Sequence, residues 1–152
     1  MEIIHILSKE HEQIEQEIEE LEEVIQELEI RGIINFPNLV HSLKRLKELW
    51  DKHEAKEERV FLVFKREKIV IPVKTILFEH GELRKHMEKI KHALETAEED
   101  LKLIIRQDGR AIIDLIQDHI AKEEEVLLTI SQEELTVEEI EELELIAREF
   151  LG

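Results

Sequence analysis

The chain contains no cysteine and no tyrosine, and its 152 residues include only four glycines, two prolines and one tryptophan. The absence of cysteine excludes disulfides, iron–sulfur clusters, thiolate zinc sites and thiol nucleophiles. The absence of tyrosine removes the phenol as a redox relay. Any metal ligand must therefore be His, Asp or Glu, which favours hard ions or Fe, Mn, Co and Zn.

Long apolar runs are also missing. No stretch of 18 apolar residues occurs, and charges interrupt the N-terminal sequence MEIIHILSKEHEQ, so we expect neither a membrane-spanning helix nor a signal peptide. Lys and Arg number 21 against 38 Asp and Glu, a formal net charge of −17. That charge disfavours nucleic acid and anionic membranes as partners and suits metal cations. We expect a soluble, cytoplasmic protein.

The few glycines and prolines divide the chain into five segments with helical periodicity. The predicted helices cover about residues 2–31, 35–66, 72–106, 110–130 and 136–150, with a turn at Asp108-Gly109 and capping-box spacing at Thr136 and Glu139. Short loops between four long helices predict an all-α, up-down-up-down four-helix bundle. We expect a single domain over 1–152, with the bundle at about 2–130 and a short C-terminal fifth helix at about 137–150.

Apolar residues at alternating spacings of three and four mark the inward face of each long helix. Six positions break these stripes: His11, His53, Glu57, His80, His119 and Glu123. A rise of about 1.5 Å per residue places all six at similar heights in antiparallel helices. An ionised carboxylate in an apolar core is strongly unfavourable unless a cation compensates it. The pattern therefore predicts one buried metal site.

One His on the first helix, His-x3-Glu on the second, His on the third and His-x3-Glu on the fourth resemble the hemerythrin-like, or HHE cation-binding, family. The resemblance implies a non-haem di-iron centre with an oxo or hydroxo bridge, in which Glu57 and Glu123 bridge the ions and the four histidines are terminal ligands. Mn or Zn are the alternative metals. The four-His, two-Glu pattern is most similar to the di-iron domains of repair-of-iron-centres proteins and of an iron-sensing ubiquitin-ligase subunit.

The sequence departs from the oxygen-carrying hemerythrins, which have a second His four residues after the one on the third helix. Here that position is Arg84, expected at the seam edge with its head in water; the alternative is a hydrogen bond to a bound oxygen species. Two octahedral ions with six such ligands and a bridge keep two positions open. Glu54 or Glu124, beside ligand positions, are candidates to fill one.

The expected function is that of a non-haem di-iron protein that binds a small molecule, O2, peroxide or NO, and reacts with it or senses it, using an external electron donor. The alternative is a reversible O2-binding or storage module, or an iron-sensing module, without catalysis. No catalytic side chain is assigned. A ferritin-like oxidase is rejected because its sites use Glu-x2-His, and a bis-His haem leaves Glu57 and Glu123 unexplained. We expect a monomer or a weak dimer.

The remaining polar residues receive ordinary interpretations. We assign His5, His41, His86 and His92 to solvated faces because they lie off the apolar stripes. The Glu-rich runs at 15–29, 95–100 and 133–144 are interpreted as solvated helix faces. The fifth helix is expected to cover a groove of the bundle.

Overall fold

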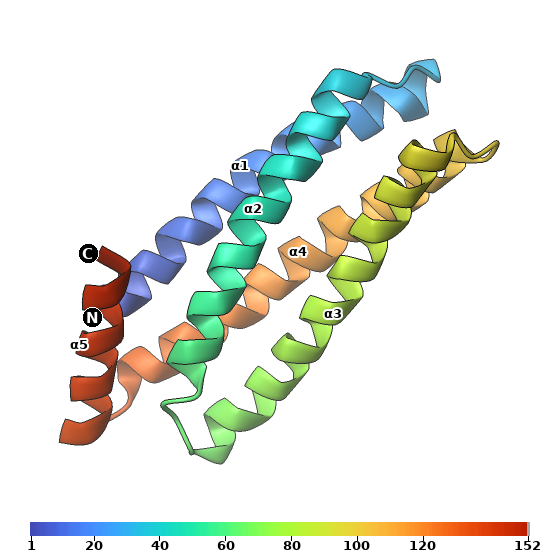
Figure 1. The fold of residues 1–152 in the computed structure, drawn as a ribbon. Coiled ribbons are helices and arrows are strands. Elements are labelled where there is room, and N and C mark those ends of the chain that lie inside the picture. Colours follow the sequence, from blue (N-terminus) through green and yellow to red (C-terminus); the bar gives the residue numbers. More distant parts are fainter. Residues whose placement is uncertain (152) are drawn as a thin grey trace.

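The computed structural model describes residues 1–151 and contains five α-helices. They are α1 (Glu2–Arg31), α2 (Phe36–Phe61), α3 (Glu67–Thr96), α4 (Leu101–Gln132) and α5 (Val137–Leu151). The first four run alternately up and down, with α1 packed on α2 and α4, and α3 packed on α4 (Figure 1). The short α5 lies across the end of the bundle beside the start of α1. The predicted fold class is confirmed.

Three predicted helix ends are confirmed by their capping interactions. The side chain of Asn35 accepts a hydrogen bond from the backbone N–H of Asn38 at 3.2 Å, which satisfies a free donor at the start of α2. Gly32 ends α1 in the left-handed region at φ 67°. Thr136 and Glu139 bond reciprocally to each other's backbone N–H at 3.1 and 2.9 Å, the two bonds of a capping box.

The predicted turn at Asp108-Gly109 is wrong. The third helix ends at Thr96 rather than 106, the fourth begins at Leu101 rather than 110, and Ala97 supplies the left-handed C-cap at φ 50°. Gly109 stays helical because α4 approaches α1 closely there: a Cβ atom on it would lie 2.5 Å from Cδ1 of Ile25. The pattern indicated a turn because Asp-Gly is a strong turn signal, whereas here the missing side chain serves helix packing.

Asp108 also corrects the prediction for His86. The Asp108 carboxylate is buried and accepts a hydrogen bond from Nδ1 of His86 at 2.7 Å. His86 is consequently half-buried between α3 and α4 rather than on a solvated face.

The link between the second and third helices also differs from prediction. α2 ends at Phe61 rather than 66, and α3 begins at Glu67 rather than 72, so Pro72 lies inside a helix. Phe64 in the link and Ile69 in the first turn of α3 are both buried. Their burial fixes the link and the start of α3 against the core. Because Pro72 lies beyond the first turn of α3, its missing N–H removes one hydrogen bond from the helix.

The core consists of two apolar clusters stacked along the bundle. One is built around residues such as Ile18, Leu46 and Ile116, and the other around residues such as Leu7, Phe64 and Val126. Leu143 and Ala147 of α5 are buried in the second cluster, so α5 packs against α1 and α2 at one end of the bundle. Two positions assigned to the apolar stripes, Phe36 and Ala97, are instead exposed.

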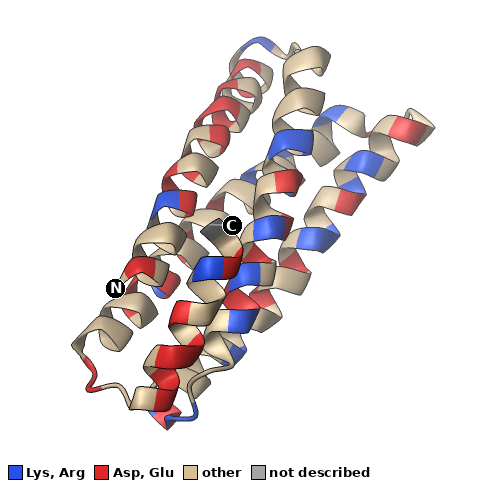
Figure 2. Ribbon diagram, turned by 60° about the vertical axis from the view of Figure 1, so that its left-hand side comes forward, with Lys and Arg blue, Asp and Glu red and all other residues tan. Residues whose placement is uncertain are grey.

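The surface is charged along its whole length. Acidic residues dominate α1 and α5, while Lys and Arg occur among the acids on α2, α3 and α4 (Figure 2). Among the described residues, no helix is long and apolar enough to cross a membrane.

Two glycines inside helices give a matched test of this packing. Gly81 has no atom within 4 Å of the place where a Cβ would lie, so Gly81→Ala is expected to stabilise the fold by about 0.5–1 kcal/mol. Gly109→Ala is expected to be neutral or destabilising, because the new methyl group meets Ile25. Urea denaturation of both variants measures the difference. Equal stabilisation by both would contradict the close approach of α4 to α1.

Candidate metal centre

The six residues that interrupt the apolar stripes lie together between the two clusters. They come from all four long helices, and each is 1–2% exposed: His11, His53, Glu57, His80, His119 and Glu123. The indole ring of Trp50 packs over two of the imidazoles, with its centroid 5.5 Å from that of His80 and 5.0 Å from that of His119. The predicted juxtaposition is therefore present in the structure, in a layer closed by apolar side chains on both sides.

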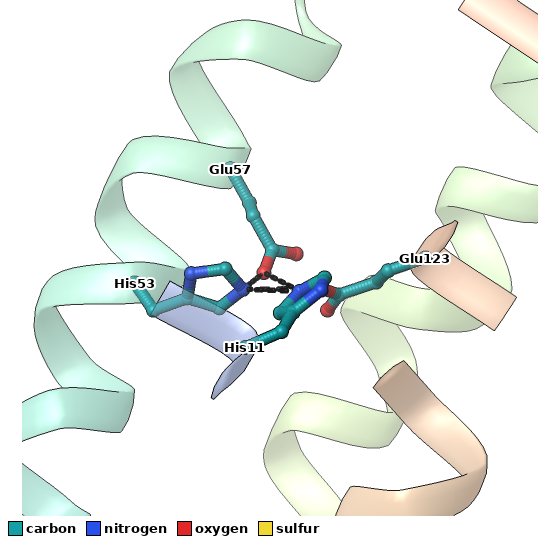
Figure 3. Close-up of side chains that lie close together, drawn as sticks. All are labelled: His11, His53, Glu57 and Glu123. Carbon is teal, nitrogen blue, oxygen red and sulfur yellow. Dashed lines mark hydrogen bonds and ion pairs between the residues drawn. The ribbon is translucent and has the colours of Figure 1, made fainter. Parts of the chain in front are cut away.

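The four histidines form two pairs that point toward each other across the bundle. Nε2 of His11 lies 2.9 Å from Nε2 of His53, and Nε2 of His80 lies 3.1 Å from Nε2 of His119. All four side chains thus turn the same ring nitrogen, Nε2, inward. Figure 3 shows the first pair together with the two glutamates that meet it.

The two glutamates lie between the histidine pairs and contact both. Oε1 of Glu57 contacts His53, while its Oε2 lies 3.9 Å from Nε2 of His80. Oε2 of Glu123 lies 2.5 Å from Nε2 of His11, and its Oε1 contacts His119. Each carboxylate therefore presents one oxygen to each pair. Two groups able to hold a metal ion result, each with two histidines, and both groups share Glu57 and Glu123.

The hydrogen-bond inventory of this layer tests whether a cation fits. Both oxygens of Glu57 and Oε1 of Glu123 are buried without a hydrogen-bond partner among the described residues. Buried carboxylate oxygens require either a donor or a cation. With imidazole nitrogens as the other donors, the set suits Fe, Mn, Co or Zn.

A family model described as "Hemerythrin HHE cation binding domain" matches residues 2–130. The chain belongs to this family. The match spans α1 to α4 nearly to the end of α4 and leaves out α5. Neither a comparison with curated proteins nor one with solved structures found a match. The family resemblance is thus confirmed, and the stripe residues form groups able to hold a metal ion, as a cation-binding family requires.

The pKa values of the histidines in this hemerythrin-like layer indicate which groups balance the charge of the buried carboxylates when no metal is bound. Burial lowers the pKa of His11, but its hydrogen bond with Glu123 and the nearby carboxylate of Glu57 outweigh it and raise that pKa to about 9. The pKa values of His53 and His119 are also raised against the effect of burial, chiefly by the charge of Glu57 and by Glu123 respectively. In the metal-free protein, protons on imidazoles therefore compensate the buried carboxylates.

The carboxylates respond in opposite directions. Burial and the charge of Glu123 raise the pKa of Glu57. Burial also acts to raise the pKa of Glu123, but hydrogen bonds with His11, His119 and His53 hold it well below its ordinary value. Glu123 lies where all four imidazoles converge, and these contacts favour its ionised form.

Three of the imidazoles are held from outside by a glutamate of a neighbouring helix. Nδ1 of His11 bonds Glu124 at 2.6 Å, Nδ1 of His53 bonds Glu10 at 3.0 Å, and Nδ1 of His119 bonds Glu79 at 3.3 Å. Such carboxylate contacts make Nδ1 the donor, orient the ring and raise the basicity of Nε2 toward a metal. The structure thus assigns orienting roles to glutamates that lie outside the six-residue layer.

Each outer carboxylate has a second partner on the helix of the histidine that it holds. Lys56 bonds Glu10, and Lys122 bonds Glu79, in both cases three residues after the histidine. Glu124 is 45% exposed and accepts from the hydroxyl of Ser8 at 3.4 Å. The outer contacts therefore connect α1 with α2, α3 with α4 and α4 with α1.

Two residues predicted as candidates to fill open positions at the metal lie elsewhere. Glu124 faces Nδ1 of His11, and Glu54 faces Nδ1 of His80, so neither carboxylate is directed into the centre. Arg84, expected with its head in water, is half-exposed but donates a hydrogen bond to Oε1 of Glu54.

Glu10 and Glu79 were not identified from the apolar stripes, although an internal repeat marks them. Glu10-His11 in α1 matches Glu79-His80 in α3, and HEAKEERV from residue 53 in α2 matches HIAKEEEV from residue 119 in α4. In both halves of the chain the Glu before the first histidine bonds the histidine of the next helix, with the repeated Lys beside it. The repeat therefore encodes the outer contacts as well as the inner ones.

The raised histidine pKa values predict how the metal-free protein responds to pH. A folded-state pKa of about 9 for His11 lies above the ordinary 6.5, so the stabilisation is complete below pH 6.5 and is lost as pH rises toward 9. We expect the unfolding free energy of chelator-treated protein to fall over that range, by on the order of 3 kcal/mol if His11 alone titrates. Urea titrations at several pH values measure it.

Metal-loaded protein is the comparison for this measurement. Its imidazoles have already released their inward protons to bind the cation, so its stability is expected to change less between pH 6.5 and 9. A metal-free protein of constant stability across this window would contradict the assignment of protons to the imidazoles.

The outer contacts predict an effect of residues that do not face the centre. Glu79→Gln keeps an accepting oxygen but removes the charge beside His119, and metal affinity is expected to fall by about 10–100-fold. Competition with a chelator of known affinity measures this. Glu88→Gln, which removes an exposed acid from the same helix, is the control. Unchanged affinity in both Glu79→Gln and Glu79→Ala would refute the orienting role.

Proposed function

We propose that the chain holds a dinuclear non-haem metal centre, with iron as the physiological metal, that binds a small molecule and reacts with it or senses it. The observation that carries this proposal is the sharing of Glu57 and Glu123 by two histidine pairs, with one carboxylate oxygen presented to each pair. Carboxylates placed in this way bridge two ions. His11 and His53 would hold one ion, and His80 and His119 the other.

Iron bound there supplies redox and ligand-binding chemistry toward O2, peroxide or NO. The burial of the layer supports a ligand of this size, since residues 1–2% exposed exclude a large substrate. Electrons for the reaction come from an external donor.

The positions of Glu54, Glu124 and Arg84 support reaction or sensing rather than simple storage. Glu54 and Glu124 face outer imidazole nitrogens, and Arg84 pairs with Glu54. With none of the three directed inward, two positions of the metal pair stay available for an incoming ligand or for water.

A specific observation also favours an iron-sensing module without catalysis as the second candidate. The centre and its outer glutamates contact all four helices of the bundle. Loss of metal then leaves buried charges that protons must compensate, and the stability of the bundle depends on metal supply. Reversible O2 binding is the other version of this non-catalytic candidate.

Anaerobic reconstitution tests the proposal. Metal-free protein supplied with Fe(II) is expected to bind two ions per chain and, on exposure to air, to develop charge-transfer absorption near the visible range. His53→Ala and Glu57→Ala are expected to lose at least one ion, because each removes a donor from the layer. Metal analysis and one optical spectrum per variant are the measurements.

His41→Ala is the matched control, since His41 is an exposed histidine on the same helix as His53. It is expected to retain both ions. One iron or none per chain in the wild type, with a featureless spectrum, would contradict the dinuclear centre. Repeated restoration of the reduced spectrum by removing O2 would favour reversible binding over reaction.

A further inference from the structure

The outer side of His80 differs from that of the other three histidines. Its Nδ1 lies 3.2 Å from Oε1 of Glu54, yet Nδ1 has no hydrogen-bond partner among the described residues, and neither has Oε2 of Glu54. Both residues are nearly inaccessible, at 1% and 3% exposure. A ring nitrogen and a carboxylate oxygen, both buried and unpaired at one place, are together suited to a cation.

The internal repeat shows that an acid has been added at this place. Glu58 in α2 corresponds to Glu124 in α4, which holds the outer nitrogen of His11. Glu54, however, corresponds to Ile120, so His80 faces two acidic positions where His11 faces one. The two halves of the bundle therefore differ in charge at the outer side of His80.

We propose that Glu54, Glu58 and Nδ1 of His80 form a capture site for a divalent cation, through which metal reaches the buried centre. The three residues each offer a donor atom within 4.8 Å of the others. Glu58 is exposed, so a cation meets it directly from solvent. This inference rests on the proposed function, because it describes how that centre is filled.

His80 connects the capture site with the centre through its two ring nitrogens. Nδ1 faces Glu54, while Nε2 lies 3.9 Å from Oε2 of Glu57. A neutral imidazole has a lone pair on only one ring nitrogen at a time. His80 therefore binds the cation first from outside and then from inside, and the loaded protein retains two ions rather than three.

Arg84 occupies the capture site while metal is absent. Its guanidinium bonds Glu54, but its side chain is 54% exposed and can withdraw into water. An arriving divalent cation replaces the arginine at Glu54, and the removal of Arg84 accelerates loading.

Loading kinetics test the proposal. Co(II) is the probe because its ligand-field bands report nitrogen and oxygen ligation without oxygen chemistry. Glu58→Gln is expected to slow the loading of metal-free protein by about tenfold at low ionic strength, with a smaller effect at high salt. Removal by a chelator is expected to slow equally, leaving the equilibrium affinity and the final spectrum unchanged. Arg84→Gln is expected to load faster than wild type.

Glu48→Gln removes an exposed acid from the same helix away from the centre and is expected to load at the wild-type rate. Glu58→Gln loading at that same rate would overturn the capture site. So would Glu54→Ile if it changed the stoichiometry or final spectrum, because Glu54 would then be a ligand of the centre itself. Failure of wild-type protein to bind Co(II) or Fe(II) would instead refute the proposed function.

Discussion

Two carboxylates buried among four imidazoles are the constraint on which this structure depends. Glu57 and Glu123 are each 1% exposed and lie between two apolar clusters. Neither cluster supplies a compensating charge, so the compensation must come from within the layer, as protons on the histidines or as metal ions. The surrounding helices hold the donors at one height whichever cation is present, and the centre is therefore organised by packing before metal arrives.

The bundle consists of two similar halves, and this similarity organises the centre. The pair α1–α2 and the pair α3–α4 each contribute a Glu-His dipeptide and a His-x-Ala-Lys-Glu-Glu segment. Each half thereby supplies two inward nitrogens, one shared carboxylate and one outer carboxylate held by a lysine. The departure from this symmetry at Glu54 and Ile120 changes the charge outside one histidine and leaves the six inward donors matched.

The inner layer could be predicted from the sequence, while the outer contacts could not be seen in the apolar stripes. His11 and Glu123 interrupt apolar stripes, and helix geometry alone places such interruptions at one height. Glu10 and Glu79 lie on polar faces rich in acids, and nothing in the periodicity of their own helix shows that they reach a histidine on the next one. The prediction of a turn at Asp108-Gly109 was wrong for a related reason, because the role of Gly109 depends on its contact with Ile25 of another helix.

With metal bound as proposed, the outer carboxylates would also link metal content to the fold of this bundle. Glu10 joins α1 to α2, Glu79 joins α3 to α4, and Glu124 joins α4 to α1. A histidine that loses its metal can keep its orientation only if its bond to the outer carboxylate persists. When a helix shifts, its outer carboxylate moves too, and the histidine that this carboxylate holds on the neighbouring helix is displaced. Between α2 and α3 the corresponding contact of Glu54 with His80 lacks a hydrogen bond. Apart from the bond of the half-exposed Arg84 to Glu54, this interface lacks the outer contact that holds the other three rings among the described residues. The ring of His80 is therefore the least constrained of the four, and ligand rearrangement during loading disturbs the fewest bonds on its side.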